Sequence, residues 1–350
     1  MEAAIAFLAR KDVQISAKRY GIDALSAMAQ GLFASLLMGT ILDTLGTLLN
    51  IEVLAQIGTY ASAVKGPAMA AAIGMSLNAP KLVLFSLLAV GYAADALGGA
   101  GGPLAVYFVA VIACECGKLV SKETKVDILV TPFVTICIGA LLSIALAPSI
   151  GAGAIWLGSL IMWATELQPF LMGMIVSVLM GIFLTLPISS AAICAALSLT
   201  GLAGGAALAG CCTQMIGFAI MSFAANRWSG LVAQGLGTSM LQMGNIIRKP
   251  VIWLPTILAS AVIGPIATCL FHLEMNGPAI SSGMGTCGLV GQIGVITGWM
   301  GEGGMASIGA MNWLGLILIS FVLPAVVTYV IHKFFLQAKL YTDEDLKLNV

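Results

Sequence analysis

The sequence predicts an all-α integral membrane protein with about ten transmembrane helices in two related halves, some of the helices re-entrant or broken. Three observations support this class. Hydrophobic residues make up 60% of the 350 residues and charged residues only 9%, whereas soluble domains carry roughly 25% charged residues. The mean hydropathy is +1.05, and glycine-rich polar runs interrupt the long apolar stretches. With so few charges the chain could not cover a soluble surface, so most of it must face lipid.

The expected helices follow from length, because a helix needs about 20 apolar residues to cross the hydrocarbon core. Ten segments approach or meet this length, near 23–49, 52–77, 81–98, 103–120, 126–148, 170–198, 201–224, 228–247, 250–272 and 308–335. They divide the chain into a cytoplasmic N-terminal segment (1–22), a first membrane half (23–148), a linker or interfacial helix (149–169), a second membrane half (170–335) and a solvated cytoplasmic tail (336–350). Trp156 and Trp163 favour the membrane–water boundary and therefore an interfacial position for the linker.

Basic residues indicate the orientation. Arg10 to Arg19 precede the first helix, and Lys118 to Lys125 follow the fourth. Four crossings between them place both groups on one side, which the positive-inside rule makes cytoplasmic. Arg248, Lys249 and the run from Lys333 to Lys339 are expected on the same side.

An internal repeat relates the halves. Residues 67–91, PAMAAAIGMSLNAPKLVLFSLLAVG, align without gaps to residues 187–211, PISSAAICAALSLTGLAGGAALAGC. Proline, the Ala-Ala-Ile core and several leucines coincide. Transporter folds are often built from such repeats, with the binding site between them.

Glycine-rich runs give the candidate binding site. GMGTCGLVGQIG (283–294) and GLGTSMLQMGN (235–245) share a Gly-Thr pair, and LPISSAA (186–192) is a third interruption. Irregular backbone inside a bilayer is tolerated only where protein buries it or water lines it, and discontinuous helices often hold the substrate. The alternative is glycine for close helix packing, as at Gly294 and Gly298. We expect solute-binding residues in the two Gly-Thr runs: Thr238, Gln242, Asn245, Gly285, Thr286 and Gln292.

Four carboxylates fall within or beside expected helices: Asp43, Asp95, Glu115 and Glu166. Ionisable residues inside a membrane usually have a function, although each is also explained as a helix-end residue that pairs or reaches the interface. Lys118, three residues after Glu115, is expected to hold that carboxylate charged. Asp43 has no basic neighbour within a turn, so we predict that it binds a proton, with Thr40 and Thr44 as hydrogen-bond partners.

Several classes are disfavoured. The formal net charge is zero, which gives no basic surface for nucleic acid. The eight cysteines form no CxxC pair, lie in apolar segments and are expected to be small buried hydrophobes. HExxH, Walker A and GxSxG motifs are absent. We expect no metal site, no cofactor and no ATP-driven step.

Three long stretches carry a resemblance: GKLVSKETKVDILVTPFVTICIGALL, GLGTSMLQMGNIIRKPVIWLPTILASAVIGPIAT and GMGTCGLVGQIG. They resemble the membrane EIIC subunits of bacterial phosphotransferase-system permeases, in the stand-alone branch related to the perfringolysin O regulator protein. The resemblance covers about residues 25–335. It implies a multi-pass protein of the bacterial inner membrane, a homodimer among membrane lipids, that presents a sugar or similar solute to a cytoplasmic EIIB-type protein.

The chain also departs from the better-known sugar permeases. It contains no EIIA or EIIB domain and so no phosphorylated residue of its own, and no acid follows Gly285-Thr286 as in the glucose-type signature. Whether it is an enzyme subunit therefore stays open. The leading function is a permease for a small polar organic solute, and the alternative is a membrane-embedded sensor or regulator that binds a ligand without transporting it.

Overall fold

The computed structural model describes residues 2–49, 51–300 and 308–348; residues 301–307 of the expected second half lie outside this part. The described residues are helical apart from turns, loops and one isolated β-bridge between Gly201 and Met275. Within the described ranges, six helical stretches are long and apolar enough to cross a membrane, and Pro169–Thr185 and Cys287–Met300 are shorter apolar helices. The predicted all-α membrane class is confirmed.

The chain forms two compact units. The N-terminal unit comprises Met1–Gly46 and Asn50–Gly153, and the C-terminal unit comprises Thr47–Leu49 and Ala154–Val350. Helix α8 (Asp127–Thr165) is continuous across the boundary. Residues 149–165 of the expected linker are therefore the last turns of a 39-residue helix, and the predicted domain limits stay a prediction.

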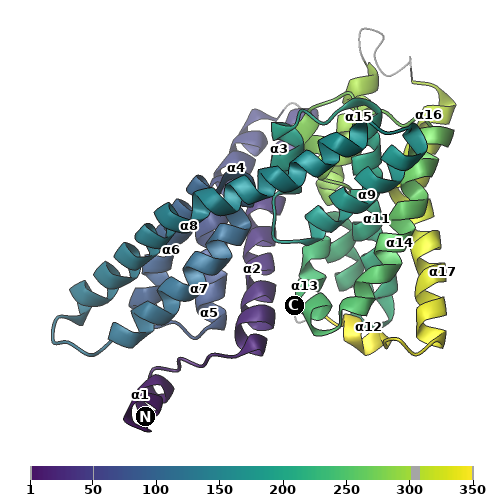
Figure 1. Ribbon diagram of the computed structural model, residues 1–350. Helices are drawn as coiled ribbons and strands as arrows, with labels where there is room; N and C mark the ends of the chain where they lie inside the picture. The colour runs from purple at the N-terminus through teal and green to yellow at the C-terminus, as the bar shows by residue number, and fades with distance from the viewer. Residues whose placement is uncertain (1, 50, 301–307, 349–350) are drawn as a thin grey trace. The chain divides into compact units, whose positions relative to one another are not determined.

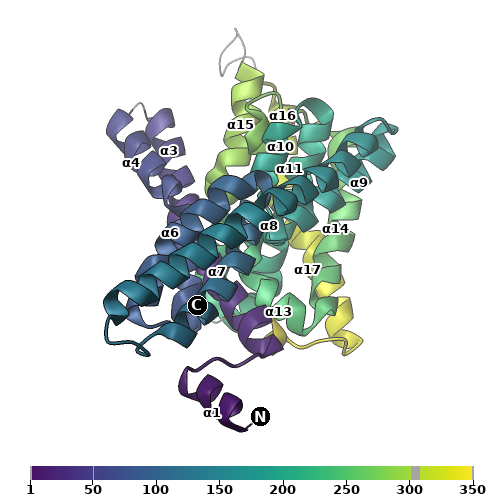
Figure 2. The ribbon, with the colours of Figure 1, turned by 60° about the vertical axis from the view of Figure 1, so that its left-hand side comes forward.

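The N-terminal unit is built around a helical hairpin. Figures 1 and 2 show α6 and α7 side by side, and both pack against α5. The chain turns between α6 and α7 at Gly99, whose φ of +51° suits glycine. The elements are α1 (Glu2–Arg10), η1 (Arg19–Ala24), α2 (Leu25–Leu32), η2 (Phe33–Leu37), α3 (Met38–Leu48), α4 (Glu52–Ala63), α5 (Lys65–Ser76), α6 (Lys81–Gly98), η3 (Gly99–Gly101) and α7 (Gly102–Val120).

The C-terminal unit surrounds one buried helix, α11, which packs against α9, α14 and α17 (Figure 1). Leu208, Ala209 and Cys212 of α11 join Ala259 and Ile263 of α14 in its core. The helices are α9 (Pro169–Thr185), α10 (Ser190–Ala196), α11 (Gly201–Met221), α12 (Phe223–Val232), α13 (Met243–Arg248), α14 (Leu254–Pro265), α15 (Val290–Met300), α16 (Ala310–Ile317) and α17 (Leu323–Gln337). Shorter elements are η4 (Ala233–Gly237), η5 (Ser239–Gln242), η6 (Pro250–Trp253), η7 (Ile266–Leu270), η8 (Ala279–Gly283), η9 (Cys287–Leu289), η11 (Leu318–Val322) and η12 (Asp343–Leu346).

The internal repeat is reproduced in the backbone of each unit. Asn78 is aligned with Ser198 in the repeat, and the two residues have φ of 55° and 49°. Each follows a short helix (α5, α10) and precedes a long one (α6, α11). The local hydrogen bonds match as well: the amide of residue 79 donates to the carbonyl of residue 74, and that of 199 to that of 194. Because the alignment uses sequence alone, this shared geometry supports two related halves.

The predicted interruptions are present. Helix α9 ends at Thr185, before the Pro187 break. The expected helix at 228–247 is not one span, because Arg227 has a φ of 53° and Thr238 is extended. Residues 228–247 are instead the end of α12, then η4, η5 and most of α13. The packing alternative holds at Gly294 and Gly298, where an added Cβ would lie 2.4 Å from the Ser281 Cβ and 2.6 Å from the Asn276 carbonyl carbon.

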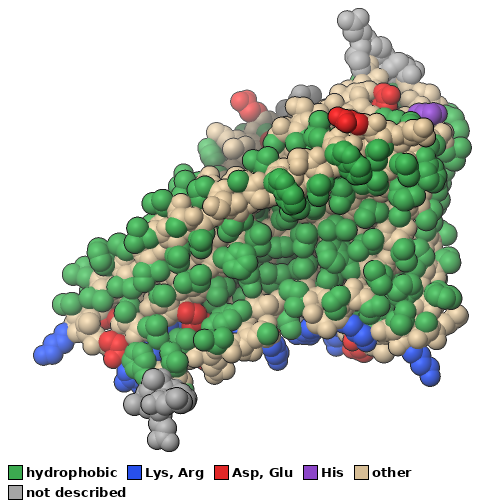
Figure 3. Space-filling view, in the orientation of Figure 1, with side chains coloured by type: hydrophobic (Ala, Val, Ile, Leu, Met, Phe, Trp, Pro, Cys, Tyr) green, Lys and Arg blue, Asp and Glu red, His purple; other side chains and the backbone are tan. Residues whose placement is uncertain are grey.

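Charge is segregated along the C-terminal unit. Figure 3 shows hydrophobic side chains over the flanks of α14 and α17, with lysine and arginine at the end that carries α12 and α13. Arg227, Arg248, Lys249 and Lys333 lie in or after the elements at that end. The positive-inside rule predicts that this end is cytoplasmic.

In the N-terminal unit the two basic groups lie on one side, as expected. Arg10 and Lys11 pair with Glu123, Arg10 at 2.7 Å. Lys118, whose side chain is 2% exposed, donates to the carbonyl oxygens of Asp12 (2.6 Å) and Leu77 (3.0 Å). These contacts fix the N-terminal segment against the loop before α6 and the end of α7.

Replacing Asp12 with asparagine is expected to loosen this segment. Arg19 donates to both Asp12 carboxylate oxygens, at 3.0 and 2.6 Å, and this bond lowers the pKa of Asp12 to about 2. Asp12 is partly exposed, so the loss is about 1 kcal/mol or less, and tryptic cleavage at Lys18 should rise by up to about fivefold. Because the pKa of Asp12 is lowered on folding, the stabilisation that the Arg19–Asp12 bond gives this segment is fully present above the ordinary pKa of 3.8. It is lost as the pH falls towards 2. Asp23→Asn is the matched control, and equal cleavage of the two variants would contradict the assignment.

Candidate functional site

The two Gly-Thr runs meet in the C-terminal unit. The Thr286 hydroxyl donates a hydrogen bond of 2.5 Å to the Gly235 carbonyl, which joins the 283–292 run to the 235–245 run. Gly285 makes this approach feasible, because its φ is +56° and an added Cβ would lie 2.9 Å from the Cys211 carbonyl carbon of α11. Only glycine satisfies both conditions without strain. The structure therefore brings together the two runs that the sequence singled out.

The first polar network follows the 235–245 run. Gln242 Nε2 donates to Gln234 Oε1 at 2.9 Å, and Gln242 Oε1 accepts from Asn245 Nδ2 at 2.8 Å. Gln234 Nε2 donates in turn to the Ser222 hydroxyl at 2.7 Å. Thr238 lies at the start of η5 and caps it, because its hydroxyl accepts from the Met240 amide at 3.2 Å. All five side chains are buried, which is a costly arrangement unless the amides are paired.

The C-terminal residues pack against this network. Gln242 Nε2 donates to the Leu346 carbonyl at 3.0 Å, and Asn245 Nδ2 donates to the Lys347 carbonyl at 2.9 Å. Tyr341 and Leu346 are 2% and 0% exposed. The expectation of a solvated end is therefore wrong for these residues. Residues 339–350 mix five apolar residues with five charged ones, and no run of apolar residues among them indicates burial.

A second network centres on Gln214 of α11, which sequence reasoning missed. Its Oε1 accepts from the Trp253 indole (3.0 Å), the Thr256 hydroxyl (2.9 Å) and the Thr185 hydroxyl (3.3 Å). The Thr185 hydroxyl also lies 2.8 Å from the Ser239 hydroxyl in the 235–245 run. Gln214 Nε2 is completely buried and has no hydrogen-bond partner among the described residues.

Gln292 adds a buried acceptor. Its Nε2 donates to the Cys212 sulfur at 3.3 Å, and its Oε1 has no partner in the described part of the chain. Leaving a buried polar atom unpaired costs about 1–3 kcal/mol. Among the described residues of the C-terminal unit, Gln214 of α11 thus has an unpaired buried amide donor, and Gln292, whose Nε2 contacts α11, has an unpaired buried amide acceptor.

The four carboxylates are placed differently. Asp95 lies 3.5 Å from Lys65 Nζ, and Glu115 lies 3.1 Å from Lys118 Nζ. The second pair is the i,i+3 pairing expected from the sequence. Asp43 and Glu166 are exposed. Of these four residues, only Glu166 belongs to the C-terminal unit.

Proton binding by Asp43 stays a prediction. Thr40, named as a partner of this carboxylate, donates instead to the Leu36 carbonyl at 2.8 Å.

No group of three or more histidine, cysteine, aspartate or glutamate side chains among the described residues is arranged to hold a metal ion. The eight cysteines are free thiols, five of them buried.

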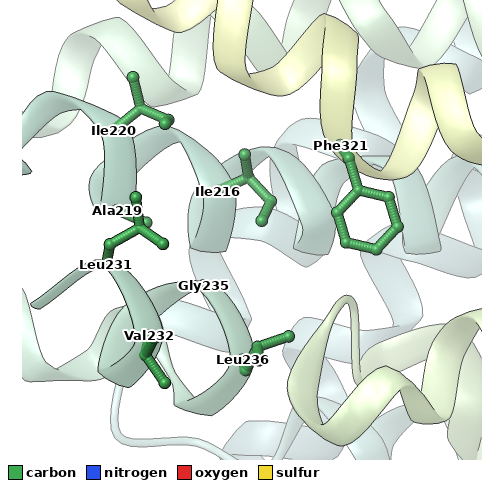
Figure 4. Close-up of a pocket in the computed structure, with 8 residues that line it drawn as sticks. All are labelled: Ile216, Ala219, Ile220, Leu231, Val232, Gly235, Leu236 and Phe321. Atoms are coloured by element: carbon green, nitrogen blue, oxygen red, sulfur yellow. The ribbon is translucent and has the colours of Figure 1, made fainter. Parts of the chain in front are cut away.

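One groove of this unit is apolar (Figure 4). Its volume is about 240 Å³, and Ile216 and Ala219 of α11, Leu231 and Val232 of α12 and Phe321 of η11 line it. Such a lining suits a lipid chain better than a hydroxyl-rich molecule. The polar networks, and not this groove, are the candidate site.

The residues missed by sequence reasoning share one property. Thr185, Gln214, Trp253 and Thr256 are single polar side chains at the ends of or inside otherwise apolar helices. Gln214 carried the only usable signal, because an amide in the middle of a 21-residue apolar helix is unusual.

Long apolar helices, broken helices and buried polar networks between them define a polytopic helical membrane protein with discontinuous helices. The chain belongs to the phosphotransferase system EIIC family, whose model matches residues 22–348. No curated protein and no solved structure matches the chain. Membership confirms the resemblance, and at the family level it supports a sugar-transport membrane permease that works with EIIB proteins.

Proposed function

We propose that this protein is the permease for a small polar organic solute, of the sugar class, that binds where the two Gly-Thr runs meet. The observation that carries the proposal is the Thr286–Gly235 hydrogen bond, which joins the two runs beside α11. Discontinuous helices that meet in this way are the usual substrate sites of transporters.

The unpaired atoms support a solute with hydroxyl groups. Gln214 Nε2 offers a donor and Gln292 Oε1 an acceptor, both buried. A hydroxyl group is both donor and acceptor, so it can pair with an atom of either kind, whereas an apolar solute can pair with neither. The uncharged lining also disfavours an ionic solute, because a buried charge needs an opposite partner.

In this proposal a separate EIIB protein supplies the phosphoryl group that is transferred to the sugar. The family works with such partners. A sensor that binds the solute without moving it is the alternative.

Uptake of labelled sugars into proteoliposomes tests the proposal. We expect accumulation of at least one sugar, stimulated by a phosphorylated EIIB protein. Saturable binding without uptake would favour the sensor, and neither binding nor uptake across a broad panel would overturn the proposal.

Replacing Thr286 with valine is expected to lower uptake by about tenfold. The substitution keeps the side-chain shape and removes the hydroxyl that joins the two runs, at a cost of about 0.5–1.5 kcal/mol for the lost bond. Thr135→Val is the control, because Thr135 is also buried but donates only to the Thr131 carbonyl in its own helix. Equal uptake by the two variants would contradict the role of Thr286.

A further inference from the structure

The chain's own C-terminal residues cover three side-chain amides: Gln242 and Asn245 of the first polar network, and Asn226 of α12. Asn226 Nδ2 donates to the Leu346 carbonyl at 2.9 Å, and Asn226 Oδ1 accepts from the Leu348 amide at 2.8 Å. Gln242 and Asn245 donate to the carbonyls of Leu346 and Lys347. The carbonyl oxygens of Leu346 and Lys347 thus accept three hydrogen bonds, one from each of the three side-chain amides.

We propose that residues 342–348, hereafter the strap, are a removable cover of this three-amide site, and that the solute reaches the amides only when the strap leaves. The inference rests on the proposed function, because Gln242 and Asn245 are among the residues assigned to the solute. The three N–H groups that the strap occupies become free together when it is released. Hydroxyl oxygens of a sugar accept hydrogen bonds as the strap carbonyls do, so the strap takes the place of the ligand.

The strap is built as a small unit. The Thr342 amide and hydroxyl donate to Asp345 Oδ2 at 2.8 and 3.0 Å, which closes a capping box around η12. A short turn of this kind keeps its shape through its own contacts.

The strap is held by the amide bonds, the fully buried Leu346 side chain and an ion pair of 2.8 Å between Lys249 and Asp345. Asp343 Oδ1 also lies 3.4 Å from His332 Nε2 on α17. The Lys249 bond also lowers the pKa of Asp345, so this carboxylate stays charged near neutral pH.

The strap also has a fixed pivot. Tyr341, just before it, is buried, and its hydroxyl lies 2.7 Å from His332 Nδ1 on α17. Lys339 turns the chain back after α17 with a φ of 56°. Release of residues 342–348 therefore leaves α17 and Tyr341 in position.

The test measures access to the covered site in purified protein. Asn245→Cys is introduced as a reporter and its labelling rate with a hydrophilic maleimide is measured, after alanine replaces the thiols that are not buried (Cys116, Cys137 and Cys269). Asp345→Ala removes the ion pair and the capping box, and Leu346→Asp makes burial of the strap unfavourable. The control is Glu344→Ala, since Glu344 is an exposed strap carboxylate. We expect tenfold faster labelling in the first two variants and no change in the control.

Transport separates this inference from the proposed function. With the native Asn245, Asp345→Ala and Leu346→Asp are expected to raise the initial uptake rate several-fold. Unchanged labelling would overturn the cover, and faster labelling with unchanged or lower uptake would overturn its control of access. If labelling became faster in a protein that neither binds nor transports any sugar, the strap would still be a removable cover. The proposed function would then be overturned, and with it the strap's control of solute access.

Discussion

Gly210→Ala is expected to leave little correctly folded protein. An added Cβ at Gly210 would lie 1.9 Å from the Ser177 carbonyl oxygen and 2.5 Å from its carbon. Both atoms belong to the backbone of α9, so no side chain can rotate away. Helices α9 and α11 would have to separate, and overpacking of this kind costs about 1–3 kcal/mol or more. We expect the melting temperature in detergent to fall by at least about 5 °C, and the yield of monodisperse protein to fall with it.

Gly153→Ala is the matched control. Gly153 lies within α8, and an added Cβ meets nothing within 4 Å. Alanine favours a helix over glycine by about 1 kcal/mol, so this variant should melt at the same temperature as the parent or slightly higher. If both alanine variants melted alike, the close approach of α9 and α11 would be refuted.

The fold class and the breaks could be predicted from sequence because each has a strong local signal. Composition decides the membrane class, and the Gly-Thr runs have too many glycines for an ordinary helix. The repeat was predictable for the same reason, and Asn78 and Ser198 show that it extends to the backbone.

The contacts between distant residues could not be predicted. Nothing local indicates that Leu346 is buried or that its carbonyl faces Gln242 and Asn226, more than 100 residues away. The length of α8 was missed because Trp156 and Trp163 favoured an interface, whereas α8 continues to them through Gly151 and Gly153, residues of a type that often ends a helix. Pro148 lies inside α8 without ending it.

The role of Gln214 was out of reach for a related reason. Its three hydrogen-bond donors come from α9, η6 and α14, and only the folded chain brings these elements together. The unpaired state of its Nε2 is likewise a property of the assembled site.

Gln214→Met is expected to lower uptake, measured as kcat/KM in proteoliposomes, by up to about tenfold while the protein stays folded. Methionine has nearly the same length but removes the free Nε2 donor proposed for the solute, and the loss of one such bond is worth up to about 1.5 kcal/mol. The fold should survive because two of the three donors to Gln214 Oε1 have another partner. Thr256 also donates to the Trp253 carbonyl at 2.9 Å, and Thr185 lies 2.8 Å from the Ser239 hydroxyl.

Thr213→Val distinguishes a binding role of Gln214 from a general intolerance of α11. Thr213 is the preceding residue, equally buried, and its hydroxyl donates only to the Ala209 carbonyl one turn earlier in the same helix, at 2.7 Å. Its replacement should therefore leave kcat/KM near the parent value. The Trp253 indole loses its acceptor in Gln214→Met, so a fall of a few degrees in melting temperature is expected for that variant alone. If Gln214→Met kept the parent kcat/KM at this reduced stability, Gln214 would be a structural residue that joins three elements, and the solute would have to bind without it.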